Sequence, residues 1–199
     1  MYDFDAGDLS LDFANTKNWH ASKKPIEELT SYADLITWGE EAGLVTPEFA
    51  SRLRQWESER PREAIRSYDH AIQVREAIYL IFSHLYAKQP VMESDLEILN
   101  SVVRKAMGNL RLAPNGGKFN WKWAEEIDGS DLILWPVARA AAELLTSDKV
   151  GRVRECEDDR GCGFLFIDQT KNHSRRWCSM DSCGNRAKAK RHYSRVQTG

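Results

Sequence analysis

The first 155 residues of the chain contain no cysteine, and all four cysteines lie in the last 44 residues. No uninterrupted apolar run approaches the ~20 residues that a membrane-spanning helix needs. The opening residues, MYDFDAGDLSLDF, have neither a basic stretch nor a long apolar run, so they do not predict a secretory signal. We therefore expect a cytoplasmic protein with reduced thiols and no membrane partner.

The sequence also lacks the patterns that usually accompany catalysis. It contains no convincing nucleophile–base pair, no phosphate-binding glycine loop and no His-x-x-x-His zinc motif. No internal repeat or low-complexity tract is present. We therefore expect a binding protein rather than an enzyme.

The four cysteines have a spacing typical of a metal site. They follow the pattern C-x5-C-x15-C-x4-C, at Cys156, Cys162, Cys178 and Cys183. In a reducing compartment, such a set indicates tetrahedral zinc rather than disulfides, and four cysteines leave no open position for a reactive water. Two alternatives stay open: four free, buried thiols, and a zinc site that releases its metal on oxidation.

The residues around the cysteines predict a treble-clef-like zinc finger. Residues 163–168, GFLFID, are rich in aromatic and branched side chains and predict a strand. A turn at 171–174 and a second strand at 175–178 would complete a hairpin, and a helix would begin near Ser179 or Asp181. A module of ~40 residues needs a metal because its apolar core is small. That core would consist of Phe164, Phe166 and Trp177.

Charge divides the chain into two parts. Residues 1–150 carry 17 Lys and Arg against 24 Asp and Glu, net −7, whereas residues 151–199 carry 11 against 6, net +5. A basic helix on a zinc scaffold is the electrostatic pattern expected of nucleic-acid binding. The alternative is a solvated basic helix, or one that docks on the acidic N-terminal part. The residues expected to contact DNA are Arg175, Arg176, Arg186, Lys188, Lys190, Arg191 and Arg195.

The C-terminal part resembles the CGNR zinc-finger family. The resemblance is carried by CEDDRGCGFLFID at 156–168 and RRWCSMDSCGNRAK at 175–188. LSLDFANT at 9–16 and SYADLITWGEEAGL at 31–44 resemble the ABATE domain, a helical domain that precedes the CGNR finger in bacterial proteins regarded as stress-induced transcriptional regulators. The resemblance covers nearly the whole chain. It implies a zinc-binding, DNA-binding C-terminal module and an N-terminal sensor domain.

The first 150 residues predict a mainly helical domain with one small β-hairpin, an α+β fold. Apolar residues recur at helical spacing, and caps, glycines and prolines bound the segments. Asn115-Gly116-Gly117 separates two strand-like runs, 110–114 and 118–123. The expected helices are 31–42, 46–60, 62–87, 94–107 and 132–145. We therefore divide the chain into a mainly helical domain, 1–150, which the resemblance implies is a sensor, and a zinc finger with a basic C-terminal helix, 151–199.

Some N-terminal residues are candidates for binding a small molecule: Asp12, Asn15, Thr16, Trp121 and Arg139. The first three form a polar cluster inside an apolar segment, and the simpler interpretation is that they cap a helix end. Trp121, together with Trp123 and Trp135, would line a pocket or belong to the core. Arg139, in an alanine-rich helix, would recognise an anionic ligand or pair with a carboxylate of the protein.

Together with the resemblance, these patterns predict a bacterial transcriptional regulator that binds DNA through a zinc finger and, as the resemblance implies, senses a ligand through its helical domain. Because one finger reads only a few base pairs, we expect a homodimer. The alternative is a zinc-stabilised protein- or RNA-interaction module without sequence-specific DNA binding. Binding through phosphates falls steeply with salt, so salt dependence distinguishes nucleic-acid binding from a mostly apolar protein contact.

Overall fold

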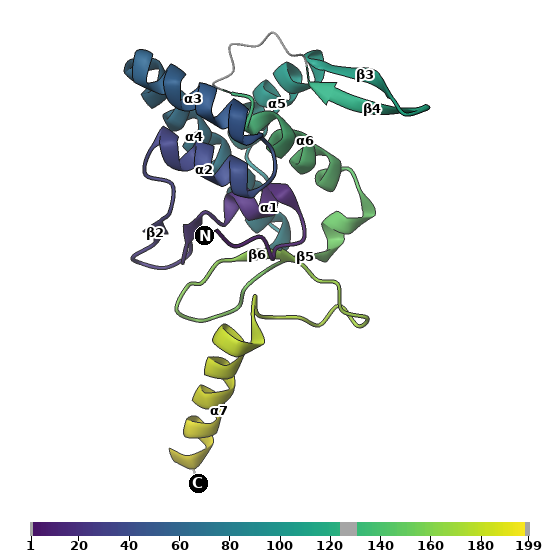
Figure 1. Cartoon of the computed structure of the whole chain (residues 1–199). Coiled ribbons are helices and arrows are strands. Elements are labelled where there is room, and N and C mark those ends of the chain that lie inside the picture. The colour runs from purple at the N-terminus through teal and green to yellow at the C-terminus, as the bar shows by residue number, and fades with distance from the viewer. Residues whose placement is uncertain (1, 124–130, 198–199) are drawn as a thin grey trace.

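The short helix α1 (Leu9–Ala14) lies at the centre of the fold. In the computed structural model, which describes residues 2–123 and 131–197, α1 packs against α4 (Pro61–Tyr86) and α6 (Leu134–Leu145), as Figure 1 shows. Every residue of α1 from Ser10 to Ala14 is buried. Because so short a helix has no stability of its own in water, the surrounding helices determine its conformation.

The remaining helices agree with the predicted ones to within a few residues. They are α2 (Tyr32–Glu41), α3 (Pro47–Glu59) and α5 (Glu93–Gly108), and a 3-10 helix, η1 (Asp148–Arg152), follows α6. The capping signals act as the sequence indicates. The Phe49 N–H donates to the hydroxyl of Thr46 at 3.3 Å, and Gly43 ends α2 with φ +70°.

Strands within the described ranges form three antiparallel pairs. These are β1 (Lys17–Asn18) with β2 (Ile26–Glu27), β3 (Leu110–Asn115) with β4 (Lys118–Trp123), and β5 (Val153–Glu155) with β6 (Leu165–Ile167). The second pair is the predicted hairpin, and its two turn glycines have φ +55° and +84°. The chain is therefore mainly helical with small β-ribbons, as expected.

The prediction of a hairpin inside the finger is wrong for one of its two strands. Residues 165–167 do form β6, but they pair with β5, which precedes the first cysteine, and residues 175–178 are not a strand. The buried carboxylate of Asp168 explains the difference. It accepts hydrogen bonds from the Thr170 N–H at 2.8 Å and the Arg175 N–H at 3.0 Å, and so turns the chain away from β6.

The hydrophobic core crosses the boundary between the two predicted domains. Val153, Leu165 and Ile167 belong to the same buried cluster as the apolar residues of α1. The side-chain amide of Asn15 donates to the carbonyl of Leu165 and accepts from its N–H, both at 2.9 Å, as a neighbouring strand would. The first half of the finger is therefore packed as part of the N-terminal domain, although the two were assigned to separate sequence segments.

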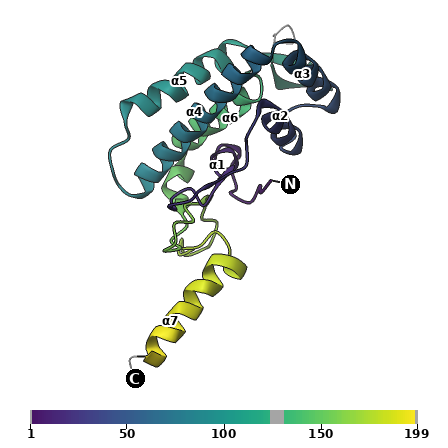
Figure 2. The same ribbon diagram turned by 90° about the vertical axis from the view of Figure 1, so that its left-hand side faces the viewer.

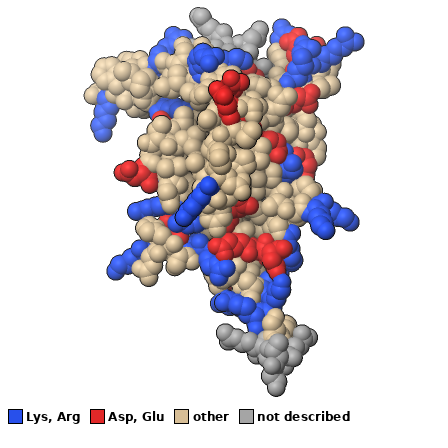
Figure 3. All heavy atoms as spheres, turned by 180° about the vertical axis from the view of Figure 1, so that it is seen from behind, with Lys and Arg blue, Asp and Glu red and all other residues tan. Residues whose placement is uncertain are grey.

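The last helix, α7 (Asn185–Gln197), extends away from the body of the molecule (Figure 2). It continues from a π-helical turn, η2 (Met180–Gly184), in which the Asp181 N–H donates to the hydroxyl of Ser179 at 3.2 Å. Seen from behind, Lys and Arg side chains lie around the base of this extension, next to a group of Asp and Glu (Figure 3). None of the described helices is both long and apolar enough to cross a membrane.

The Asn15 side chain is expected to be essential for stability. Asn15→Ala leaves the buried N–H and C=O of Leu165 without partners, so the free energy of unfolding should fall by about 2–4 kcal/mol. Asn18→Ala is the control, because Asn18 is exposed; its side-chain amide donates to the Glu28 carboxylate and accepts from the N–H of Trp19. Urea unfolding measures both variants; equal losses would contradict the assignment.

Candidate zinc site and basic helix

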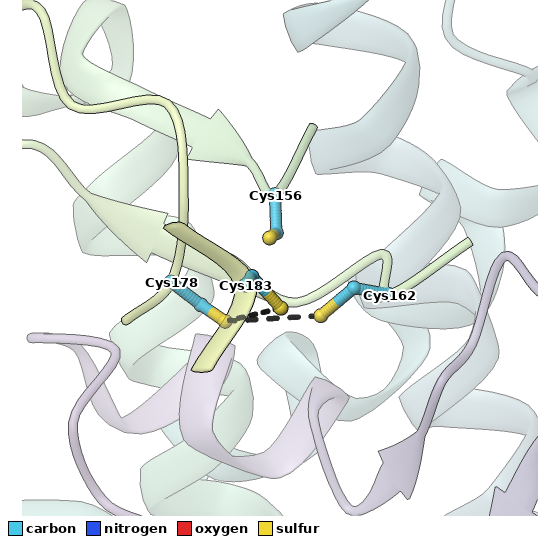
Figure 4. Close-up of side chains that lie close together, drawn as sticks. All are labelled: Cys156, Cys162, Cys178 and Cys183. Atoms are coloured by element: carbon cyan, nitrogen blue, oxygen red, sulfur yellow. Dashed lines mark hydrogen bonds between the residues drawn. The ribbon is translucent and has the colours of Figure 1, made fainter. Parts of the chain in front are cut away.

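The four cysteines converge from two separate parts of the finger (Figure 4). Cys156 follows β5 and Cys162 ends the next turn, whereas Cys178 and Cys183 immediately precede α7. Their sulfur atoms all lie within 4.8 Å of one another, with 3.8 Å between Cys162 and Cys178 and 3.7 Å between Cys178 and Cys183. Four thiolates at ~2.3 Å from one zinc ion would stand ~3.8 Å apart. The arrangement fits zinc and is too open for disulfides, whose sulfurs lie ~2.05 Å apart.

The thiols cannot all ionise without a cation between them. A hydrogen bond to Cys156 raises the pKa of Cys162 to about 12, and burial raises the pKa of Cys183. The complementary hydrogen bonds lower the pKa of Cys156, so the cluster favours a single shared negative charge. A divalent cation supplies the charge that allows four thiolates to coexist.

The loop between the first two cysteines is pressed against the N-terminal domain. Gly161 and Gly163 have φ +86° and +67°, a backbone conformation that favours glycine. A Cβ on Gly161 would lie 2.5 Å from the carbonyl oxygen of Ala21, and one on Gly163 would lie 2.7 Å from the hydroxyl of Tyr79. This half of the site is therefore positioned by the helical body, which leaves no room for larger residues.

Arg175 supports the second half of the site from inside the protein. Its guanidinium donates to the carbonyl oxygens of Trp177 and Cys178, and it lies 4.3 Å from the centroid of the Phe166 ring. These contacts hold the chain beside the third cysteine. The same arginine was expected to contact DNA, but the structure engages its guanidinium in the finger itself.

A short acidic loop, Glu157 to Asp159, lies beside the predicted DNA-binding residues. Glu157 pairs with Arg176 at 2.5 Å, Asp158 lies 3.5 Å from Arg186, and Asp159 pairs with Lys190. The loop and α7 line a groove of about 390 Å³ together with Trp177. Arg160 also bonds Asp158 at 2.9 Å and lowers the pKa of that carboxyl. The signal for this role in the sequence is the acidic run EDD, which lies between two cysteines in an otherwise basic segment.

The acidic loop distinguishes two faces of α7. Arg186 and Lys190, four residues apart, face the loop's carboxylates. Lys188 and Arg191 are exposed, and the described part of the chain offers neither of them an ion-pair partner; the Arg191 guanidinium lies 5.7 Å from the centroid of the Trp177 ring. Arg195 follows on the Lys188 and Arg191 face by helical spacing, but its side chain lies outside the described residues.

Trp19 is a second contributor that sequence analysis missed. It packs against the cysteine cluster from the N-terminal domain, and the guanidinium groups of Arg160 and Arg186 lie 4.8 and 5.5 Å from its ring centroid. Arg186 also donates to the sulfur of Cys183 at 3.2 Å. No periodic pattern surrounds this tryptophan in the sequence, so only the tertiary structure reveals the contact.

The three N-terminal ligand candidates make hydrogen bonds inside the protein. Asp12 accepts from the Ala6 N–H at 3.0 Å, and the Thr16 hydroxyl donates to the carbonyl of Phe13 at 2.8 Å. Together with the Asn15 contacts to Leu165, these bonds satisfy backbone groups, whereas the N-terminal cap of α1 is Asp8, whose carboxylate accepts from the Ser10 N–H. The hydrogen bonds of Asn15 also join the helical domain to the finger, which helix capping alone does not predict.

The other two ligand candidates lie together on the surface. Trp121 is exposed on β4, and the guanidinium of Arg139 lies 5.8 Å from its ring centroid. Arg139 also pairs with Glu143 at 2.7 Å, one turn along α6. Trp123 and Trp135 were predicted to line a pocket with Trp121 or to belong to the core. Trp135 is buried and Trp123 packs against it with ring centroids 5.7 Å apart, so both belong to the core or its edge.

Fold and site define a class of protein in which a helical domain carries a four-cysteine zinc finger. Residues 7–148 match the ABATE family model, described as "Putative stress-induced transcription regulator", and residues 152–196 match the CGNR zinc finger. The first match alone covers more than half of the chain, so the chain belongs to the ABATE family. A search of curated proteins finds no match. The predicted family, domain order and zinc ion are confirmed.

Cys178→Ser is expected to remove zinc and release α7 without unfolding the body. The variant loses one of four thiolates, whereas Val153, Leu165 and Ile167 keep their places in the main core. Metal analysis should therefore show loss of zinc, and circular dichroism a small loss of helix with a retained main unfolding transition. Ser182→Ala is the control. Full zinc content in the cysteine variant would refute the ligand assignment.

Asp12 predicts a distinct pH dependence of stability. Burial, aided by the charge of Asp8, raises its pKa from 3.8 to about 7. Because the folded-state pKa is the higher one, the stabilising contribution of the protonated carboxyl is complete below about pH 4 and is lost as the pH rises through about 7. Asp12→Asn keeps the acceptor for Ala6, so its stability relative to wild type should increase by about 1 kcal/mol between pH 6 and pH 8.5. A constant difference in urea unfolding would contradict this.

Proposed function

We propose that this zinc-finger regulator binds duplex DNA through the exposed face of α7. The single observation that carries the proposal is the division of α7 by the acidic loop. Arg186 and Lys190 face carboxylates of the finger, whereas Lys188 is exposed and Arg191, which lines the groove beside Trp177, has no ion-pair partner among the described residues. A helix with cations on its outer face and a metal-held base can contact successive phosphates along a groove.

The charge of the finger supports the same assignment. Its net charge is +5, against −7 for residues 1–150, so an approaching polyanion is attracted to the end of the molecule that carries α7. The acidic loop repels phosphates from the inner face of the helix and thereby orients the duplex on the outer face. Nonspecific electrostatic attraction and a defined orientation would together let each protein chain bind duplex DNA weakly but in one orientation.

We further propose that ligand sensing takes place at the junction between the helical body and the finger. A cavity of about 300 Å³ supports it, because Asn15 and Trp19 line it from the body and Cys178 and Arg186 from the finger. A small molecule bound there would contact both the body and the finger. It could change the position of α7 only by binding two arrangements of body and finger with different affinities.

A homodimer belongs to the same proposal because a single finger reads few base pairs. No catalytic step is assigned, since four thiolates close the zinc coordination sphere.

The test is binding of the zinc-loaded protein to labelled duplex DNA by fluorescence anisotropy across a salt series. Lys188→Ala/Arg191→Ala should weaken binding and reduce the slope of log affinity against log salt by about 1.8, if each side chain neutralises one phosphate. The matched control is Arg62→Ala/Arg66→Ala, which removes two exposed arginines of α4. An unchanged slope in the α7 variant would place the DNA contact elsewhere.

A second variant tests the acidic loop by an increase in affinity. Asp159→Asn removes the carboxylate that pairs with Lys190, so this lysine can turn to a phosphate. We expect tighter duplex binding and a slope steeper by about 0.9. Asp181→Asn, which removes another exposed carboxylate of the finger, is the control. No duplex binding by wild type at low salt would instead favour a protein-contact or purely structural role for the finger.

A further inference from the structure

The cavity between body and finger reaches the cysteine cluster from one side. Its wall includes Cys162, Cys178 and Cys183. Cys178 is the most accessible of the four cysteines: it is half-buried, whereas the other three are only 2–5% exposed. With about 300 Å³, the cavity has room for several molecules of the size of water, which occupies ~30 Å³. A small reagent can therefore reach Cys178 in the folded protein.

The chemistry of the cavity wall restricts which reagents enter. Asp3, Asp5 and Glu28 contribute carboxylates to it, and the cation in the described part of the wall is Arg186. A wall with this excess of negative charge repels an anionic oxidant such as glutathione disulfide, but it does not repel neutral hydrogen peroxide. Polar side chains that can hydrogen-bond a peroxide line the cavity as well: Asn15, Asn18, Ser179 and Ser182.

The sulfur of Cys178 has two close sulfur neighbours (Figure 4). It lies 3.8 Å from the sulfur of Cys162 and 3.7 Å from that of Cys183. A disulfide bond is ~2.05 Å long, so either pair must approach by less than ~2 Å. The difference between the two distances is too small to decide which pair can join.

The surroundings of the two neighbours decide between them. Cys162 lies between Gly161 and Gly163, where an added Cβ would come within 2.5 Å and 2.7 Å of atoms of the helical body. The loop that carries Cys162 has no room to shift toward the finger's second half without losing this close packing. Cys178 and Cys183 instead lie on one short segment that leads into α7, so they can approach each other without moving the body.

We propose that hydrogen peroxide oxidises Cys178, which then forms a disulfide with Cys183. The sulfur of Cys178 attacks one peroxide oxygen, the O–O bond breaks, and the sulfur becomes a sulfenic acid while hydroxide leaves. The sulfur of Cys183 then attacks the sulfur of Cys178, the S–O bond breaks, and a second hydroxide leaves. The two thiolates lose two electrons in all, and the peroxide, with two protons from solvent, becomes two water molecules.

This disulfide removes both metal ligands in the half of the site that carries α7. Cys156 and Cys162 remain as thiols on the loop held by the body, and two ligands do not complete the tetrahedral set of a structural zinc site. Oxidation therefore releases zinc and breaks the metal link between α7 and the body. The inference concerns the cysteines alone and does not depend on the duplex contact proposed for α7.

The experiment treats the full-length, zinc-loaded protein with one equivalent of hydrogen peroxide and follows zinc release with the dye pyridylazoresorcinol. Remaining thiols are then blocked with iodoacetamide, and the protein is digested with trypsin, which cleaves after Lys and Arg. Cys156 and Cys162 fall on separate peptides, 155–160 and 161–171, whereas Cys178 and Cys183 share the peptide 177–186. Mass spectrometry therefore distinguishes the possible disulfides.

We expect zinc release together with a peptide 177–186 that is two hydrogens lighter and not alkylated, while Cys156 and Cys162 are alkylated. Dithiothreitol and added zinc should restore the original zinc content, because a disulfide is reversible. Retention of zinc in excess peroxide would overturn the proposal. A disulfide that joins peptides 161–171 and 177–186 would also overturn it, because Cys162 would then be the partner of Cys178.

A variant that narrows the cavity tests the route of the oxidant. Ser182→Leu places a larger side chain in the cavity wall and should slow zinc release by peroxide several-fold, since thiol oxidation depends on access. Ser174→Leu makes the same change at an exposed position of the finger outside this wall, and it should release zinc as wild type does. Equal rates in all three proteins would show that the proposed route through the cavity is wrong.

Discussion

Convergence of four thiolates on one zinc ion is the constraint on which the arrangement of this protein depends. Two of the ligands, Cys156 and Cys162, lie on a loop pressed against the helical body, where Gly161 and Gly163 allow an approach that no larger residue permits. The other two ligands lead directly into α7. The metal therefore joins the basic helix to a body with which the helix itself makes few contacts. Arg186 reinforces the joint, because it reaches both the sulfur of Cys183 and the ring of Trp19.

Electrostatics then decides what the helix can offer to a partner. A basic helix could direct any of its cations outward, but the acidic loop, Glu157 to Asp159, engages Arg176, Arg186 and Lys190. The pairs made by Glu157 and Asp159 are exposed and contribute little to stability, so their main physical effect is on orientation and on the encounter with other charges. At the other end of the molecule, the β3–β4 ribbon combines cations with exposed aromatic rings.

Much of the fold could be predicted because its signals are local. Caps, prolines and glycines bound the helices α2 to α6, and the Asn-Gly-Gly turn identifies the β3–β4 hairpin. The metal ligands could be predicted from spacing and residue type alone. The strand pairing in the finger could not, since a three-residue strand carries no information about its partner. Its partner is β5, which Asn15 and the main core hold in place, and the carboxylate of Asp168 diverts residues 170–175.

The amino-acid sequence by itself determined the family, the zinc ligands, the helical class and the concentration of positive charge at the C-terminal end. These depend on residue type and spacing, which a linear chain displays directly. Only the tertiary structure decided that the finger shares a core with the body, that Trp19 supports the cysteine cluster and that Arg175 is engaged inside the finger. It also separated the two faces of α7. Each of these depends on contacts between residues distant in sequence or on which carboxylate lies nearest a cation, and neither follows from local pattern.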